Sequence, residues 1–319
     1  MVSRVSVIIP VWNAEAFVRQ AVESALALDV VGEVVLVEDG STDRSLEVCR
    51  DLEQDSRVRL LQHPDGGNHG AGASRNLGIR AARFAYIAFL DADDWYLPNR
   101  FAVDVPLMES DGSVDGVYGA ARFENQGEDV AIPHNEDTLL TLSGDNAPEN
   151  LFSALLFGGK GFFTTDAVTV RAEAFSRAGL FDETLPLGQD AAMWLKLAGV
   201  CRLVGGQRDE PVAVVRRHAA NRWRPGNPAW RDANFRVHIA VWRWALGTGL
   251  SKKRIAQLRR AAALSLVGRR EGLSRSMMLC VILRRLVYSG WRIPALLTEL
   301  GRVVLLKLVG RSLVPGHEA

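Results

Sequence analysis

Cysteine is scarce in this chain, and its three cysteines do not form pairs. Cys49, Cys201 and Cys280 stand far apart, without the spacing of a metal site or a disulfide framework. Such usage is typical of a reducing compartment. Long apolar segments are lacking as well. No uncharged run approaches the roughly 18 residues of a membrane span, and the opening MVSRVSVIIPVWN lacks the apolar length of a signal peptide. We therefore expect a cytoplasmic protein without a spanning helix.

Glycine is absent where two common nucleotide-binding motifs would place it. The segment after the first expected strand reads PVWNAEAF, residues 10–17. It contains no G-x-G-x-x-G, which disfavours a dinucleotide-binding oxidoreductase. It also lacks the glycine- and lysine-rich phosphate loop expected of a nucleotidyltransferase. Internal repeats and low-complexity segments are missing too, which argues against a repeat architecture.

The composition that remains is ordinary for a globular protein, but the charge is uneven. The chain has 319 residues, 48% of them hydrophobic and 24% charged, which suffices for a large core. Its length suggests about two domains. The formal net charge is +1, yet residues 1–250 hold 24 Lys and Arg against 34 Asp and Glu, whereas residues 251–319 hold 14 against 3. The last fifth is therefore strongly basic and the rest acidic.

Strand-like and helix-like segments alternate through the first ninety residues. Apolar, β-branched runs predict strands, and apolar residues at helical spacing predict helices between them. The expected strands cover 4–9, 33–38, 57–62 and 85–90, and the expected helices cover 14–28, 43–54 and 73–83. This alternation predicts a Rossmann-like α/β fold, with a mostly parallel sheet and helices on both of its faces.

The second part of the chain shows a weaker pattern. Between about 110 and 165 we expect irregular structure, with loops at ENQGEDV and LSGDNAPEN. Further strands are expected at 166–171 and 211–217, and a helix at 188–200. Beyond Pro228 the pattern becomes helical, with basic residues among apolar ones.

Polar side chains follow three of the expected strands at their carboxyl ends. Pro10 to Asn13 follow the first strand, Asp39 the second, and Asp91, Asp93 and Asp94 the fourth. Because ligands bind beyond the carboxyl ends of such strands, we expect these residues to share one crevice. Taken alone, DADD is typical of a turn. Three carboxylates in four positions repel one another, however, unless a cation or hydrogen-bond donors are held there.

Five segments in register carry a resemblance to a known family. They read VSVIIPVWNAEAFVRQAVESAL, VVLVEDGSTDRS, GASRNLGIRAA, YIAFLDADDWYLPNR and GLFDETLPLGQDAAMWLKLA. In this order they resemble family 2 glycosyltransferases of the GT-A fold, over roughly residues 4–225. The resemblance implies an inverting, metal-dependent transferase of the hexosyltransferase type. Such an enzyme moves a sugar from a nucleotide diphosphate sugar, here with UDP favoured, to an acceptor hydroxyl.

The same resemblance implies roles for individual residues. It implies nucleotide binding by Pro10, Asn13, Asp39, Arg75 and Asp91, metal binding by Asp93 and His218, catalysis by Asp190, and diphosphate contacts from Arg222 and Arg224. The metal would be Mn²⁺ or Mg²⁺, with Asp91 on the ribose or the metal, and Asp190 would be the general base. Two positions depart from the family: Glu38 stands where Asp is more frequent, and Gln189 replaces a Glu. The alternatives are a helix cap for Asp190 and surface positions for Arg75 and His218.

The basic tail predicts a second region with a different role. We expect a GT-A catalytic domain at 1–228 and a helical, basic, amphipathic C-terminal extension at 229–319. Basic residues interleaved with Leu and Trp are typical of helices on anionic lipid, so we expect peripheral attachment to the inner face of the cell membrane. The high apolar content argues against a nucleic-acid partner. Packing on the catalytic domain is the alternative.

The acceptor and the competing functions follow from these expectations. A membrane-bound transferase would act on a carbohydrate or lipid-linked acceptor, in the assembly of cell-surface polysaccharide or glycolipid. A catalytically degenerate sugar-binding or scaffold protein stays open, as does a nucleotidyltransferase. The presence of Asp39, Asp91, Asp93 and Asp190 argues against degeneracy.

Overall fold

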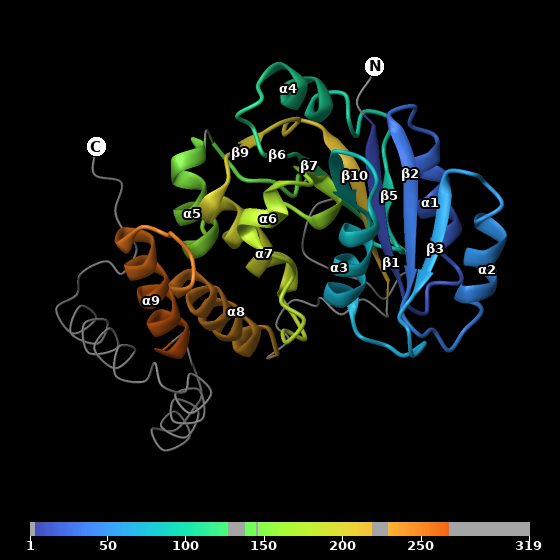
Figure 1. Ribbon diagram of the computed structural model, residues 1–319. Coiled ribbons are helices and arrows are strands. Elements are labelled where there is room, and N and C mark those ends of the chain that lie inside the picture. The colour runs from blue at the N-terminus through green and yellow to red at the C-terminus, as the bar shows by residue number, and fades with distance from the viewer. Residues whose placement is uncertain (1–3, 127–137, 145, 219–228, 268–319) are drawn as a thin grey trace.

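Residues 4–126, 138–144, 146–218 and 229–267 are described by the computed structural model (Figure 1). They form a seven-stranded sheet, a second sheet of three strands, and helices packed on both faces of the larger sheet. Among these residues, no helix combines the length and apolarity needed to span a bilayer. The expected α/β fold is confirmed.

The large sheet is mostly parallel. In spatial order it contains β3 (Val58–Gln62), β2 (Val31–Glu38), β1 (Val5–Val11), β4 (Tyr86–Phe89), β8 (Val168–Arg171), β6 (Gly116–Tyr118) and β9 (Leu203–Gly205). Only β8 runs antiparallel to its two neighbours, β4 and β6. The small sheet contains β5 (Trp95–Tyr96), β10 (Pro211–Arg217) and β7 (Ala120–Asn125). Because β5 begins directly after the DADD segment, the small sheet meets the large one at the acidic cluster.

Alternating side chains of the central strands build a separate core on each face. The described helices are α1 (Val18–Leu26), α2 (Ser45–Leu52), α3 (Ala71–Ala81), α4 (Asp104–Ser110), α5 (Pro148–Phe157), α6 (Ala174–Ala178), α7 (Gln189–Val200), α8 (Ala229–Leu246) and α9 (Lys252–Val267). In β1, Val7 and Ile9 join the core under α1, whereas Ile8 points to the other core. On that side α3 lies close to β1, since a Cβ added to Gly78 would come within 2.4 Å of Ile8.

The expectation of irregular structure from 110 to 165 is wrong in part. The segment contains β6, β7 and α5. The two strands have only 3 and 6 residues, too few for a clear alternation of side chains. Helix α5 begins at Pro148, inside the expected loop LSGDNAPEN; proline at the first turn of a helix is a start signal that favours this position.

Helices α8 and α9 share the core of the preceding domain. Phe235 and Trp242 of α8 and Leu258 of α9 belong to the same buried cluster as α5 and α7. Gln257 of α9 donates to the hydroxyl of Ser153 in α5 at 2.8 Å. The alternative of packing on the catalytic domain therefore applies to residues 229–267. Residues 268–319, most of the expected basic extension, lie outside the described residues.

Candidate active site

One pocket of about 690 Å³ lies beyond the carboxyl ends of β1, β2 and β4. It brings together Pro10, Asn13, Asp39, Arg75, Asp91, Asp93, Asp190 and His218. These residues come from positions spread over more than 200 residues of the chain. The crevice expected from strand order is thus present. Arg222 and Arg224 lie outside the described residues.

The acidic segment after β4 forms a tight turn as well as a pocket wall. The amide of Asp94 donates to the carbonyl of Asp91 at 3.0 Å, which closes the turn. Asp91 and Asp93 are partly exposed to the pocket, whereas Asp94 is buried beneath them. The turn expected from DADD is therefore present, and the same turn forms a wall of the pocket.

Asp93 lies next to His218, as the predicted metal pair requires. The Nε2 atom of His218 is 2.9 Å from Oδ2 of Asp93, although 125 residues separate them. His218 directly follows β10, so the small sheet delivers the imidazole to the acidic turn. A carboxylate beside an imidazole suits Mn²⁺, which accepts both ligand types, and carboxylates with phosphate oxygens suit Mg²⁺. The donor set therefore fits the implied cation.

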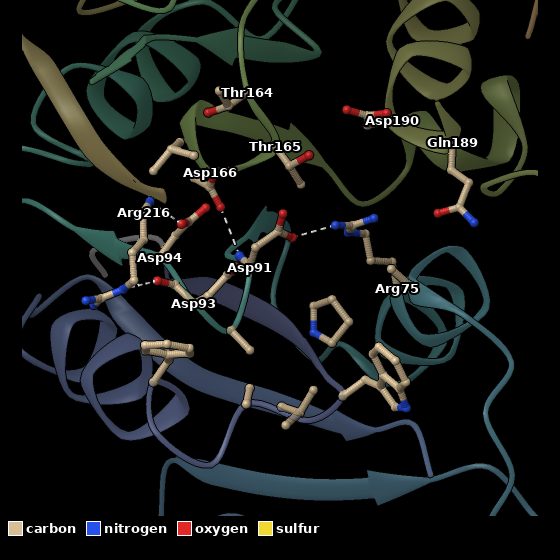
Figure 2. Close-up of a pocket in the computed structure, with 18 of the residues that line it drawn as sticks. Arg75, Asp91, Asp93, Asp94, Thr164, Thr165, Asp166, Gln189, Asp190 and Arg216 are labelled. Atoms are coloured by element: carbon tan, nitrogen blue, oxygen red, sulfur yellow. Dashed lines mark hydrogen bonds and ion pairs between the residues drawn. The ribbon is translucent and has the colours of Figure 1, made fainter. Parts of the chain in front are cut away.

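Beneath this pair, three carboxylates face one another (Figure 2). Asp91, Asp94 and Asp166 can each offer an oxygen within 4.8 Å of the others. Asp166 accepts the amide of Asp91 at 2.9 Å, and Asp94 accepts the amide of Arg216 at 2.7 Å. Burial raises the pKa of Asp94 well above its usual value, and the charge of Asp166 raises it further. These hydrogen bonds tie β4, β8 and β10 together below the pocket.

Proton sharing explains how such a cluster is stable. Burial raises the pKa of Asp166 to about 7, and the charge of Asp91 adds to this rise. Burial also raises the pKa of Asp91, against the lowering effect of Arg75. A carboxyl group that keeps its proton near neutral pH can donate to a neighbouring carboxylate instead of repelling it. The side chain of Asp94 accordingly lowers the pKa of Asp166 in part, against the rise that burial causes.

Arg216 holds the acidic turn from the side of β10. Its Nε atom donates to the carbonyl of Asp93 at 2.7 Å, and its guanidinium lies between the rings of Phe17 and Trp95, 4.9 Å and 4.6 Å from their centroids. A further nitrogen donates to Gln20 at 2.5 Å. Arg216 is therefore a buried structural cation that orients Asp93.

Arg75 lies below the pocket surface. Its side chain is only 6% exposed, and it donates to Oδ1 of Asp91 at 2.5 Å. The guanidinium also lies 5.6 Å from the ring centroid of Phe181, and its Nε atom has no hydrogen-bond partner among the described residues. The alternative of a surface arginine is wrong. A cation with unused donors in this position suits an anionic ligand.

Asp39 is held by the loop that leads into α3. Its two carboxylate oxygens accept the amides of His69 and Gly70 at 2.7 and 2.9 Å. The loop passes so near β2 that a Cβ on Gly40, whose φ is +69°, would lie 2.7 Å from the Gly67 backbone. The carboxylate is thereby oriented at the pocket wall, and the Nε2 atom of His63 lies 3.4 Å from its Oδ1.

Asn13, which we predicted at the nucleotide together with Asp39, and Glu38, which precedes Asp39, both have structural roles. Asn13, with a φ of 50°, accepts the amide of Thr42 at 2.8 Å and so joins the loops after β1 and β2. Glu38 accepts the amide of Ser41 at 2.6 Å and the side-chain amide of Gln62 at 2.9 Å. Glu38 therefore braces this loop, and it is not among the residues that line the pocket.

Asp190 lies in the first turn of α7 and lines the pocket. Gly188 precedes the helix in the left-handed conformation, with a φ of 75°. The charge of Asp190 contributes to the raised pKa of Asp91, as expected for carboxylates around one cavity. Gln189 instead donates to the carbonyl of Leu185 at 2.6 Å and packs against Gly72 of α3. The first turn of α7 thus brings two side chains to the pocket, the carboxylate of Asp190 and the bracing amide of Gln189.

The structure also places in the pocket several residues that we did not predict for the site. Asp166 and Arg216 complete the support of the acidic turn, and Phe162, Thr164 and Thr165 line the same cavity. Asp166 opens the expected strand at 166–171, and an aspartate at the start of a strand is a weak signal for a site. Arg216 opens the segment 216–224, RRHAANRWR, in which we predicted His218, Arg222 and Arg224 but not Arg216.

Comparisons with known proteins agree with this architecture. The family model described as glycosyl transferase family 2 matches residues 6–177. An uncharacterized glycosyltransferase of Rickettsia felis is 29% identical over 198 residues, which are 61% of this chain and 31% of that protein. An uncharacterized glycosyltransferase of Haemophilus influenzae is 34% identical over 146 residues, 44% of this chain and 58% of that protein. The matches thus span less than two thirds of these relatives' own length.

Solved structures share the fold at low sequence identity. Residues 1–349 of S. aureus TarS, in complex with UDP-GlcNAc, superpose with a TM-score of 0.65 at 17% identity, covering 97% of this chain and 92% of that one. The mannosyltransferase PcManGT of Pyrobaculum calidifontis, in complex with GDP-Man and Mn²⁺, gives a TM-score of 0.54 at 18% identity, covering 96% and 81%. Both comparisons concern the fold.

Proposed function

The chain belongs to glycosyl transferase family 2, and we propose that it moves a sugar from a nucleotide diphosphate sugar to an acceptor hydroxyl with inversion at the anomeric carbon. The observation that carries this proposal is the meeting of Asp39, Asp93, His218 and Asp190 on the walls of one pocket. These groups supply base recognition, a cation site and a general base. UDP is the favoured nucleotide, and a neighbour in complex with UDP-GlcNAc supports it.

In this proposal the nucleotide lies along the ends of β1, β2 and β4. Asp39 accepts a hydrogen bond from an N–H of the base, because its carboxylate is already oriented by two backbone amides. Pro10 and Asn13 form the adjoining wall. Arg75, now paired with Asp91, offers its remaining donors to the diphosphate, and Arg222 and Arg224 stay predicted contacts of the same group.

Asp93 and His218 would hold Mn²⁺ or Mg²⁺, with Asp91 on the cation or on the ribose. When bound, the cation neutralises the charge that develops on the leaving diphosphate. Arg216 acts indirectly, because it fixes the backbone of Asp93 and so the direction of that carboxylate. A neighbour that contains Mn²⁺ together with GDP-Man supports such a site.

Asp190 would act as the general base. Its carboxylate takes the proton of the acceptor hydroxyl while that oxygen attacks the anomeric carbon, and the bond from this carbon to the diphosphate oxygen breaks. A single displacement from the opposite face inverts the configuration. The position of Asp190 across from the acidic turn, with no ion-pair partner among the described residues, supports this role.

For cellular location we propose that the enzyme is cytoplasmic and peripheral on the inner membrane face. We divide it into a catalytic domain at 1–228 and an extension at 229–319, whose first two helices, α8 and α9, pack on that domain. Residues 268–319 carry nine Lys and Arg against three Glu. Each basic residue near anionic lipid contributes on the order of 1 kcal/mol. Such a location suits a carbohydrate or lipid-linked acceptor, in polysaccharide or glycolipid assembly.

Vesicle sedimentation tests this location. The full chain should pellet with anionic vesicles and be released only in part by high salt, whereas a chain ending at residue 267, which keeps α8 and α9, should stay in the supernatant. Equal sedimentation of the two chains, or none with either, would contradict a membrane role for the tail.

The activity itself is tested by release of the nucleotide diphosphate. UDP-GlcNAc, UDP-glucose and GDP-mannose are incubated with the full chain and Mn²⁺, with and without a membrane extract as acceptor source. We expect slow hydrolysis of one donor and faster release with the extract. Tight binding without release from any donor would favour the degenerate sugar-binding protein.

A further inference from the structure

Two consecutive phenylalanines at the pocket have opposite surroundings. Phe163 is 3% exposed and stacks on Tyr118, with ring centroids 4.6 Å apart. Phe162 is 49% exposed and lines the pocket. Of the three large apolar side chains that are exposed among the described residues, Phe162 and Trp12 lie at this pocket, and Leu246 does not. Exposed aromatic surface is thus concentrated where a ligand binds.

Backbone geometry fixes Phe162 in this position. Glycines at 158, 159 and 161 have φ values of 66°, 86° and 92°, in the left-handed region. A Cβ on Gly161 would lie 2.2 Å from the carbonyl of Thr141, so only glycine fits. The carbonyl of Lys160 accepts the amide of Ser143 at 2.6 Å. The backbone just before Phe162 is therefore bonded to the neighbouring segment, and the ring of Phe162 lies at the pocket.

Hydroxyl groups follow the aromatic ring along the same wall. Thr165 is 5% exposed and lines the pocket, and Thr164 carries a buried hydroxyl with no partner among the described residues. Figure 2 shows both threonines leading to Asp166, while Asp190 comes from a different element. An apolar ring with free hydroxyls and a carboxylate nearby matches a pyranose, which has C–H groups on one face and hydroxyls around its edge.

We propose that the acceptor is a saccharide whose terminal pyranose ring lies on Phe162 and bonds to the hydroxyls of Thr164 and Thr165. This inference rests on the proposed function, because the acceptor hydroxyl must reach Asp190. Phe162 suits the acceptor better than the donor. The donor's nucleotide is held at Asp39, whereas Phe162 stands half exposed, where a longer saccharide can extend into solvent.

Ligand-observed NMR tests the proposal with defined probes. The full chain, with UDP and Mg²⁺, is titrated with the methyl pyranosides of glucose, galactose, mannose and N-acetylglucosamine, and with ribitol and glycerol as acyclic controls. We expect saturation transfer to the ring C–H protons of at least one pyranoside and none to the alditols. Phe162→Ala should weaken that binding at least tenfold, and Phe162→Tyr should leave it within twofold. Thr164→Val, which is nearly isosteric, should weaken it severalfold.

Two further variants separate binding from folding. Leu246→Ala removes an equally exposed apolar side chain outside the pocket and should change neither binding nor melting temperature. Phe163→Ala should lower the melting temperature, whereas Phe162→Ala should not. Donor hydrolysis by Leu246→Ala should stay within twofold of wild type, because Leu246 lies outside the pocket.

The outcomes distinguish this inference from the proposed function. If donor hydrolysis is present but pyranosides bind no better than ribitol, or bind Phe162→Ala as tightly as wild type, the saccharide subsite is wrong and the glycosyltransferase stands. If no donor is bound or hydrolysed, the proposed function itself fails.

Discussion

Asp93 and Asp94 are neighbours in the sequence, yet their carboxylates belong to different regions of the molecule. Asp93 faces the pocket beside His218, and Asp190 faces the same pocket from α7. Asp94 is buried below with Asp166, where hydrogen bonds hold three strands together. One acidic segment therefore supplies one carboxylate to a pocket-facing pair, Asp93 with His218, and one to an enclosed pair, Asp94 with Asp166. The difference suggests that substitutions in the first region change chemistry, and those in the second change stability.

Asp93→Ala should have the largest effect on turnover. The variant loses the carboxylate beside His218, so donor hydrolysis and transfer should fall to background even at saturating Mn²⁺. Its melting temperature should stay close to wild type, because Asp93 is partly exposed. Nucleotide release with each donor and a thermal melt measure the two properties. If Asp93→Ala turned over as fast as wild type, Asp93 would have no role in the reaction.

Asp190→Asn should slow turnover by about 10²- to 10⁴-fold, the usual contribution of a general base. Donor binding should change little, because a base acts in the transition state more than in the ground state. Comparing kcat with the donor dissociation constant separates these effects. A variant that loses donor binding first would assign Asp190 to the nucleotide site instead.

Arg216→Met should combine the effects expected for the two regions, a change in turnover and a loss of stability. It keeps an apolar side chain between Phe17 and Trp95 but removes the bond to the carbonyl of Asp93. We expect a weaker Mn²⁺ response in turnover together with a stability loss of about 1–3 kcal/mol. Titration of activity with Mn²⁺ and denaturant unfolding measure both. Arg122→Met, at a partly exposed ion pair with Glu124, serves as the control for loss of an arginine.

Asp166→Asn should have the smallest effect, seen mainly in the dependence of stability on pH. The pKa of Asp166 rises from 3.8 to about 7 in the folded state. Between these values the folded protein keeps a proton that the unfolded chain has lost, so stability falls as pH rises. The slope is at most about 1.4 kcal/mol per pH unit. In cation-free buffer, the free energy of unfolding of the variant should fall less steeply with rising pH than that of wild type.

The difference between wild type and Asp166→Asn reports the proton held by the buried cluster of Asp94 and Asp166, because the charge of Asp166 also raises the pKa of Asp94. Burial lowers the pKa of His238 to about 4, so its contribution to stability changes with pH in the opposite direction, but it is the same in both chains. Unfolding by denaturant at pH 5, 6 and 7 gives the two slopes. Parallel slopes would show that Asp166 does not change the number of protons that the cluster holds in this range.

The ligand-facing region was predictable, and the enclosed region was not. Asp39, Asp91 and Asp93 end strands whose order follows from their alternation with helices, so their convergence follows from topology. Asp166 pairs with Asp91 across 75 residues, through the antiparallel strand β8, and no local pattern indicates that pairing. The positions of Phe162 and Phe163 differ because of glycine conformations, which composition alone does not reveal.

The secondary structure was likewise predictable in one part of the chain and not in the other. The expected strands and helices up to residue 90 are present within a few residues, since each has a strong periodic pattern. Beyond them, β6 and β9 have three residues each and depend on the strands beside them for their existence. Helices α8 and α9 looked like the start of a separate extension because of their basic residues, yet their apolar faces join the main core.

Calorimetric titration of UDP and of GDP, each with and without Mn²⁺, tests the central claim most directly. Wild type, Asp93→Asn and Asp166→Asn are compared at pH 7.5. If the pocket-facing pair holds the cation and its nucleotide, wild type and Asp166→Asn will bind one nucleotide in a Mn²⁺-dependent way, and Asp93→Asn will not. Mn²⁺-dependent binding that survives in Asp93→Asn and disappears in Asp166→Asn would place the cation in the enclosed cluster and contradict the account.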